Sequence, residues 1–189
     1  GVLVKKSQEQ GLFAKGIKDS KRLSDNTISR LAAEIKTACA HSIVIINPEK
    51  YNELIGKMKN LNHLLAWGHA RVIENILEKE PCEHVISDQF GDESLIKNAL
   101  MKKGETVQLE QRHHGEEDLA VACASILARD TFVKRIKDLS KEYAIDLPKG
   151  ASEQVIFTGK EFVKKYDSEK LGKVAKLHFK TTKQVLNSP

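Results

Sequence analysis

The stretch His84-Val85-Ile86-Ser87-Asp88-Gln89-Phe90 decides the fold of this chain. It is a short apolar run that ends on a carboxylate, which is typical of a buried strand that stops at Asp88. Thirty residues later, Asp118 opens a helix-like run that extends to Arg129 and beyond. The segment between the two acids fits one helix and one strand. If the two strands are parallel neighbours, Asp88 and Asp118 emerge at the same carboxyl edge of the sheet, where open α/β sheets place their ligands.

Two carboxylates at one sheet edge favour a site for hard divalent cations such as Mg²⁺ or Mn²⁺. Each acid also has an ordinary structural explanation. An acid in the first turn of a helix, such as Asp118, is stabilised by the helix dipole by roughly 0.3–1 kcal/mol. An acid at a strand end, such as Asp88, can cap the next helix. Only their sharing of one edge favours the metal site over these alternatives.

Apolar periodicity along the rest of the chain alternates between strands and helices, which predicts an α/β domain with a partly parallel central sheet. We expect strands at residues 1–4, 41–46, 84–88 and 106–110, and helices at about 26–38, 49–58, 61–79, 93–102 and 118–143, with two or three more helices after residue 150. Asp25 or Asn26 is expected to cap the first of these helices, and Trp67 is expected in the core. No repeat or long linker interrupts residues 1–189, so we expect one domain with a helical, basic region from about residue 150.

Composition indicates a globular chain, at 40% hydrophobic and 30% charged residues. No apolar run approaches the roughly 20 residues of a membrane span, and the start does not resemble a signal peptide. The three cysteines are an odd number without metal-like spacing. They are typical of buried, reduced thiols and argue against a structural zinc site. We therefore expect a cytoplasmic monomer with no membrane partner.

Positive charge is concentrated in the carboxyl-terminal third of the chain. From residue 131 to residue 189 there are 13 Lys and Arg against 7 Asp and Glu, whereas the rest of the chain has 18 against 19. A basic region of this kind favours a polyanionic partner, of which nucleic acid is the commonest. The alternative is a Lys-rich surface that keeps the protein soluble.

Several motifs in a fixed order point to one family. The stretch Lys18-Asp19-Ser20-Lys21-Arg22-Leu23 resembles the Lys-Asp-Ser-Lys-x-Leu motif of type 2 ribonucleases H. Residues 47–52, 60–62, 67–69, 86–90 and 122–129 continue the resemblance in the family's order. Residues 147–151 and 175–179 resemble the ribonuclease HIII branch rather than ribonuclease HII. The resemblance covers nearly the whole chain.

This resemblance implies a ribonuclease H-like mixed central sheet flanked by helices, with a helical carboxyl-terminal region. It also implies an endonuclease that cuts the RNA strand of an RNA–DNA hybrid duplex with Mg²⁺ or Mn²⁺. Four acids hold the metals in the family. The third carries over to Asp88 and the fourth to Asp118, with Glu117 and Glu116 as open alternatives. The first two belong to an Asp-Glu-x-Gly-x-Gly motif that this chain does not contain. The family's amino-terminal substrate-binding domain has no counterpart either, so we expect an amino-terminally truncated chain that is impaired alone.

Candidate substrate contacts are Lys18, Ser20, Lys21 and Lys149, with Lys176 as a weaker candidate. Each has a solvated surface position as its alternative. Two rival functions stay open on the same fold. One is a non-catalytic nucleic-acid-binding module that uses the basic carboxyl-terminal helices, and the other is a DNA-specific nuclease.

Overall fold

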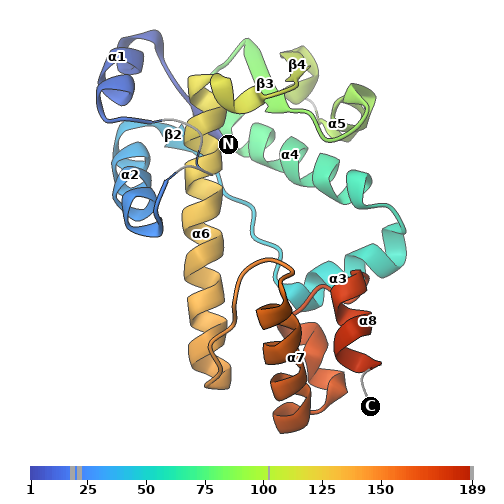
Figure 1. Cartoon of the computed structure of the whole chain (residues 1–189). Coiled ribbons are helices and arrows are strands. Elements are labelled where there is room, and N and C mark those ends of the chain that lie inside the picture. Colours follow the sequence, from blue (N-terminus) through green and yellow to red (C-terminus); the bar gives the residue numbers. More distant parts are fainter. Residues whose placement is uncertain (18–19, 21–22, 102, 188–189) are drawn as a thin grey trace. The chain divides into compact units, whose positions relative to one another are not determined.

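The computed structural model describes residues 1–17, 20, 23–101 and 103–187, which form helices and short strands (Figure 1). The helices are α1 (Lys6–Ala14), α2 (Asp25–Ala38), α3 (Pro48–Met58), α4 (Leu61–Leu77), α5 (Glu93–Ala99), α6 (Leu119–Tyr143), α7 (Glu153–Tyr166) and α8 (Lys180–Leu186). The strands are β1 (Val2–Leu3), β2 (Ala40–His41), β3 (His84–Asp88) and β4 (Gln108–Arg112). Short 3₁₀ helices include η2 (Gly104–Thr106), η3 (Gly115–Glu117) and η4 (Ser168–Lys173).

Two compact units divide the chain. Unit 1 comprises Gly1–Val44 and Asn60–Thr131, and unit 2 comprises Ile45–Lys59 together with the described residues from Phe132 on. Both pairs of strands belong to unit 1. No helix in the described ranges combines the length and the apolar character needed to cross a membrane.

Strands β3 and β4 are parallel neighbours, as the sequence predicts (Figure 1). Their register places Asp88, the last residue of β3, opposite Arg112, the last residue of β4. Strands β1 and β2 form a separate antiparallel pair, in which Val2 lies opposite His41. The parallel pair therefore brings two carboxyl strand ends to one edge, and η3 and α6 follow directly from it.

The expected strand at residues 41–46 is wrong beyond His41. β2 contains only Ala40 and His41, and Ile45 is 56% exposed. The ladder with β1 is two residues long, and the last backbone hydrogen bond after it runs from the Ser42 N–H to the Gly1 carbonyl at 3.1 Å. A strand needs a neighbour for its backbone groups, and the described chain provides none beyond this point, where unit 1 gives way to unit 2.

Buried Glu74 explains why α5 ends earlier and β4 begins later than the sequence predicts. The carboxylate of Glu74, which is 4% exposed, accepts hydrogen bonds from the N–H groups of Met101 at 2.6 Å and Gly104 at 2.9 Å. These bonds hold the turn between α5 and β4 against α4. A Cβ at Gly104 would lie 2.5 Å from the end of the Leu100 side chain and 2.7 Å from the Glu74 carboxylate, so a side chain here would displace both.

Two details of the helices differ from expectation. The cap of α2 is Ser24, whose hydroxyl accepts from the Thr27 N–H at 3.2 Å, and not Asp25 or Asn26. Trp67 is 40% exposed and lies outside the core. Helix α4 is apolar on most of its surface, so its pattern does not identify which side packs inward.

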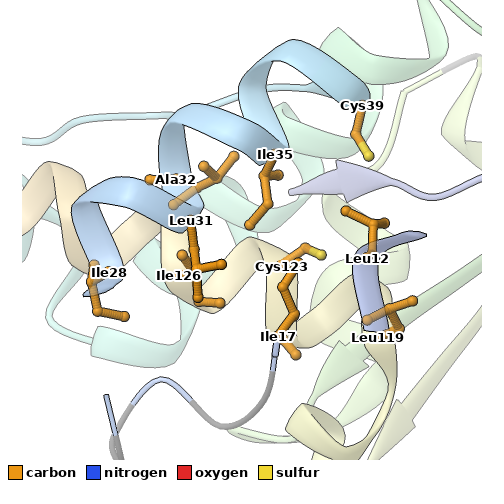
Figure 2. Close-up of a cluster of buried hydrophobic side chains, with 12 residues drawn as sticks. Leu12, Ile17, Ile28, Leu31, Ala32, Ile35, Cys39, Leu119, Cys123 and Ile126 are labelled. Carbon is orange, nitrogen blue, oxygen red and sulfur yellow. The ribbon is translucent and has the colours of Figure 1, made fainter. Parts of the chain in front are cut away.

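The main core of unit 1 packs α2 against α6 (Figure 2). Leu31 and Ile35 of α2 are fully buried, as are Cys123 and Ile126 of α6. The small residues of α6 allow this close packing. Cys39 and Cys123 are buried free thiols, as expected. Burial raises the pKa of Cys123 to about 12, so this thiol stays protonated at neutral pH.

Unit 2 has its own core around Phe162, which is fully buried against the rings of Tyr143 and Tyr166. Asn52 of α3 ties a distant segment into this unit. Its amide N–H groups donate to the carbonyls of Gly172 and Ala175, each at 2.9 Å. Helices α7 and α8 pack closely, since a Cβ at Gly159 would lie 2.6 Å from the side chain of Val185.

Candidate metal site at the ends of β3 and β4

Gly115 is hydrogen-bonded to both of the acids that the sequence singles out. Its N–H donates to Oδ1 of Asp88 at 3.1 Å, and its carbonyl accepts from the N–H of Asp118 at 2.9 Å. Asp88 is the last residue of β3, and Asp118 precedes the first residue of α6. The structure therefore brings together two acids thirty residues apart, on either side of one glycine.

The turn that joins these acids has little freedom. A Cβ at Gly115 would lie 2.9 Å from the Cα of Asp88 and 3.1 Å from its backbone nitrogen. Real Cβ atoms do not come so close to backbone, so this position requires glycine. The preceding residue, His114, is left-handed at φ 56° and ψ 42°, a conformation that costs roughly 1–2 kcal/mol for a residue with a side chain. Close packing against β3 therefore sets the path of the chain from β4 into α6.

Each carboxylate uses one oxygen to fix its own position. Oδ1 of Asp118 accepts from the N–H groups of Ala120 at 2.9 Å and Val121 at 3.2 Å, which caps α6. Oδ1 of Asp88 accepts from Gly115. The Oδ2 atom of each acid accepts no hydrogen bond from the part of the chain that the structure describes. The helix-capping alternative for Asp118 is therefore real, and it leaves one oxygen of the same carboxylate available.

A cation of the protein lies next to this pair. Arg112 ends β4 and donates to both oxygens of Glu110, from Nε at 2.6 Å and from an Nη at 2.8 Å. The pKa of Arg112 is raised, mainly by this hydrogen-bonded pair with Glu110 and to a lesser extent by the charge of Asp118. Positive charge of the chain thus already faces the site, although part of it is neutralised by Glu110.

His69 of α4 holds the end of β3 from the other side. Its Nδ1 lies 3.1 Å from Oγ of Ser87, and its ring packs on Phe90 at 4.9 Å between centroids. Burial lowers the pKa of His69, and the nearby charge of Asp88 partly opposes this effect. His69 is therefore a hydrogen-bonded packing residue.

The donor set fits part of a site for a hard divalent cation. Two carboxylates, each with an oxygen left over, come from adjacent segments, and carboxylate oxygens are what Mg²⁺ and Mn²⁺ prefer. Among the side chains that the structure describes, no three His, Cys, Asp or Glu residues lie close enough to hold a metal ion by themselves. Glu117 is exposed in η3 and stays an alternative to Asp118.

The structure describes two of the four substrate contacts that the sequence predicts, Ser20 and Lys149. Ser20 is 4% exposed, and its hydroxyl lies 2.7 Å from the hydroxyl of Ser125 on α6. Lys18 and Lys21 lie outside the described residues. Lys149 is exposed in the loop between α6 and α7, in unit 2. The roles of these four residues in substrate binding therefore stay predictions.

Sequence reasoning missed Gly115 and Arg112. The available signal was their order: a strand that ends on a basic residue, then a glycine within an acid-rich turn, then the helix. That order suggests a tight turn. It does not reveal that the backbone of Asp88, far away in sequence, fills the space of the missing side chain.

The chain is similar to known proteins over almost its full length. The family model described as ribonuclease HII matches residues 1–182. The chain is 50% identical to a protein named ribonuclease HIII from Protochlamydia amoebophila, over 98% of this chain and 62% of that protein. It is 45% identical to the ribonuclease HIII of Chlamydia pneumoniae, over 92% of this chain and 59% of that protein. It thus spans about three fifths of the length of these relatives.

Solved structures show the same similarity. The crystal structure of Bst-RNase HIII in complex with Mn²⁺ matches with a TM-score of 0.89 at 27% identity, over 98% of this chain and 62% of that chain. The structure of Aquifex aeolicus RNase H3 matches with a TM-score of 0.74 at 28% identity, over 93% of this chain and 63% of that chain. These matches confirm the ribonuclease H-like α/β fold with a helical carboxyl-terminal region, and they confirm the resemblance drawn from the motifs.

Proposed function

Because the chain belongs to the ribonuclease HII family, we propose that it forms part of an endonuclease that hydrolyses the RNA strand of RNA–DNA hybrid duplexes with Mg²⁺ or Mn²⁺. One observation carries this proposal beyond the family assignment. Gly115 joins two carboxylates at the edge of a parallel strand pair, and each keeps one oxygen without a hydrogen bond from the described chain.

Asp88 is proposed as a direct metal ligand. Asp118 is proposed as a ligand of the second metal or as the carboxylate that orders its waters. When bound, two divalent cations would supply an activated water and charge stabilisation for the leaving 3′-oxygen of a phosphodiester. The chain's own contribution is orientation. The N–H of Gly115 fixes the carboxylate of Asp88, and the first turn of α6 fixes that of Asp118, so each Oδ2 is held in place before any cation arrives.

The RNA–DNA hybrid is proposed as substrate. The feature that would distinguish its RNA strand from DNA is the 2′-hydroxyl, which is accessible across the wide minor groove. Lys18, Ser20, Lys21 and Lys149 are proposed as backbone or phosphate contacts. Contacts to phosphate make affinity fall as salt rises. We further propose that the protein acts as a cytoplasmic monomer and that residues 1–189 belong to one catalytic domain.

The 189-residue chain alone is expected to be nearly inactive. Mg²⁺ takes about six oxygen ligands in near-octahedral geometry, and two cations held by two carboxylates would rely almost entirely on water. The measurement is hydrolysis of a labelled hybrid by the purified chain in Mg²⁺ and in Mn²⁺. Rapid cleavage by this chain alone would show that other ligands are not required.

The central test is Asp88→Asn in the full-length protein. This change keeps the shape and the hydrogen bond from Gly115 but removes the negative charge. We expect cleavage of the hybrid to fall by more than about 100-fold in either metal, because loss of a metal ligand exceeds the 10–100-fold effects typical of outer-sphere changes. Binding of the hybrid without metal is expected to be unchanged.

A matched control is Glu83→Gln, which removes the same charge just before the opposite end of the same strand, from an exposed residue. It is expected to cleave like the parent. Unchanged cleavage by Asp88→Asn in both metals would refute the assignment of Asp88. Faster cleavage of a DNA–DNA duplex than of the hybrid would favour a DNA-specific nuclease. Salt-dependent binding with no cleavage by the full-length protein would favour a non-catalytic binding module.

A further inference from the structure

Unit 2 contains a compact group of side chains that does not include the two acids. We call it the lysine–aromatic cluster, and it consists of Tyr51, Lys176, His178 and Phe179. The ammonium of Lys176 lies 4.5 Å from the ring centroid of Tyr51 and 6.0 Å from that of Phe179. The ring of His178 stacks on Tyr51 at 5.6 Å and packs on Phe179 at 4.1 Å. The ammonium thus lies near two aromatic rings, and His178 packs against both of them.

The cluster is held in place by α3. The side-chain carbonyl of Asn52 accepts from the N–H of Leu177 at 2.9 Å, while its amide donates to the carbonyls of Gly172 and Ala175, also at 2.9 Å. The hydroxyl of Thr182 donates to the carbonyl of Lys176 at 3.1 Å. The backbone on both sides of Lys176 is therefore anchored, so this lysine loses less conformational freedom on binding a ligand than a lysine on a free loop.

The positive charge of Lys176 is not balanced by a carboxylate within the described chain. No described carboxylate lies within salt-bridge distance of Lys176, and the rings around it remove water, which lowers its pKa. Tyr51 is only 6% exposed, and its hydroxyl has no hydrogen-bond partner among the described residues. Lys176 is itself exposed, so its ammonium, placed over the Tyr51 ring, is available to an anion from outside the chain.

The surroundings of the cluster are basic and partly apolar. Residues 168–186 contain five lysines and one glutamate. This glutamate is Glu169, in η4. Beside the ammonium, Phe179 is 45% exposed and Leu177 is 42% exposed. A cation next to exposed apolar surface suits a ligand that alternates charge with apolar groups, as the sugar–phosphate backbone of a nucleic acid does.

We propose that the lysine–aromatic cluster binds the backbone of a nucleic-acid strand, with Lys176 on a phosphate and Phe179 against the adjoining sugar. This inference rests on the proposed function for the identity of the duplex and adds a second contact region to it. Lysine is a common phosphate ligand that acts as a point charge. Contacts of this type set affinity and register but not sequence preference, so the site is expected to bind hybrids of any sequence.

The test measures binding of a fluorescent hybrid duplex to the 189-residue chain by anisotropy, in EDTA, over a range of salt concentrations. Lys176→Gln is expected to weaken binding by about 3–10-fold at low salt and to reduce the slope of log affinity against log salt by ~0.9, the value for one lost phosphate contact. Phe179→Ala is expected to weaken binding at all salt concentrations without changing this slope. Lys176→Arg is expected to restore the slope.

Lys57→Gln is the matched control. It removes one positive charge from an exposed lysine on α3, the helix that carries Tyr51, outside the cluster. It is expected to change the slope less than Lys176→Gln does. An unchanged slope in Lys176→Gln, in protein with the thermal stability of the parent, overturns the inference. Polyglutamate is tested in the same assay as a model of an acidic protein. If Lys176→Gln loses binding of polyglutamate but binds the hybrid as the parent does, the inference is also overturned, and an acidic protein is indicated as the partner.

Failure of this inference is distinguishable from failure of the proposed function. The anisotropy is measured without divalent metal, so it does not depend on Asp88 or Asp118. Asp88→Asn is expected to bind with the affinity and salt slope of the parent. If Asp88→Asn loses cleavage while Lys176→Gln keeps the salt slope of the parent, the cluster does not contact the substrate. The assignment of the metal site would then still hold.

Discussion

Replacement of Gly115 by alanine tests whether one residue holds the two acids together. The new Cβ would lie 2.9 Å from the Cα of Asp88, 3.1 Å from its backbone nitrogen and 3.2 Å from its Cβ. Carbon atoms prefer separations of about 3.5–4.0 Å, so the overlap is roughly 0.5–1 Å. The atoms that it meets belong mostly to backbone, which cannot turn away as the end of a flexible side chain can.

The structure indicates which side must move. Five consecutive residues of β3 pair with β4, so the strand resists displacement, and the turn at η3 is expected to shift away from it. Overpacking of this kind costs about 1–3 kcal/mol, less than the roughly 5–15 kcal/mol that stabilises a domain. The variant is therefore expected to fold. A displacement near 1 Å at the site is expected to reduce cleavage about 100-fold.

Two assays separate these effects. Urea unfolding of the chain measures the loss of stability, and hybrid cleavage by the full-length protein measures the loss of positioning. Gly68→Ala on α4 is the matched control in the same unit, because no atom beyond its chain neighbours and the backbone of its own helix lies within 4 Å of the added Cβ. It is expected to stabilise the helix by roughly 0.5–1 kcal/mol and leave cleavage unchanged. Parental stability and cleavage in Gly115→Ala would refute the idea that this contact joins the acids.

Two further predictions concern buried groups. Glu74→Ala is expected to lower the free energy of unfolding by about 2–5 kcal/mol, because it leaves one buried and one partly buried N–H group without this acceptor. Glu105→Ala, in the exposed residue after Gly104, is expected to change it by less than about 0.5 kcal/mol. Equal effects of the two substitutions in a urea titration would contradict this prediction. A thiol reagent at mildly alkaline pH is expected to modify Cys82 quickly, but Cys39 and Cys123 only on unfolding. Burial raises the pKa of Cys39 and of Cys123, so both thiols stay protonated and covered. Rapid modification of all three thiols would contradict the core described above.

Elements with a strong period were predictable from the sequence. The apolar positions of α2, among them Ile28, Leu31 and Ile35, are buried as their spacing indicates. The approach of Asp88 and Asp118 was predictable for a different reason. A strand, a helix and a parallel strand return the chain to the same edge, so residues that end the strands share that edge whatever the details of the connection.

Features that depend on contacts distant in sequence were not predictable. The strand expected at residues 41–46 has the right composition, but Ile45 lacks a neighbouring strand in the described chain. The start of β4 depends on hydrogen bonds to Glu74, which lies on another helix. The need for glycine at position 115 arises from the backbone of Asp88. In the last two cases the deciding interaction joins residues more than 25 positions apart, beyond the range of local patterns.

The anchoring of unit 2 by Asn52 has a consequence for synthesis on the ribosome. The partners of this side chain lie up to 125 residues further along the chain. At about 5–20 residues per second, α3 leaves the peptidyl-transferase centre roughly 6–25 s before Leu177 is added. During that interval the nascent helix exposes Tyr51 without its covering segment, and the synthesis of unit 1 is completed at Thr131, before Leu177 is added. Translation speed between these two segments therefore sets how long the growing chain is open to chaperones and proteases.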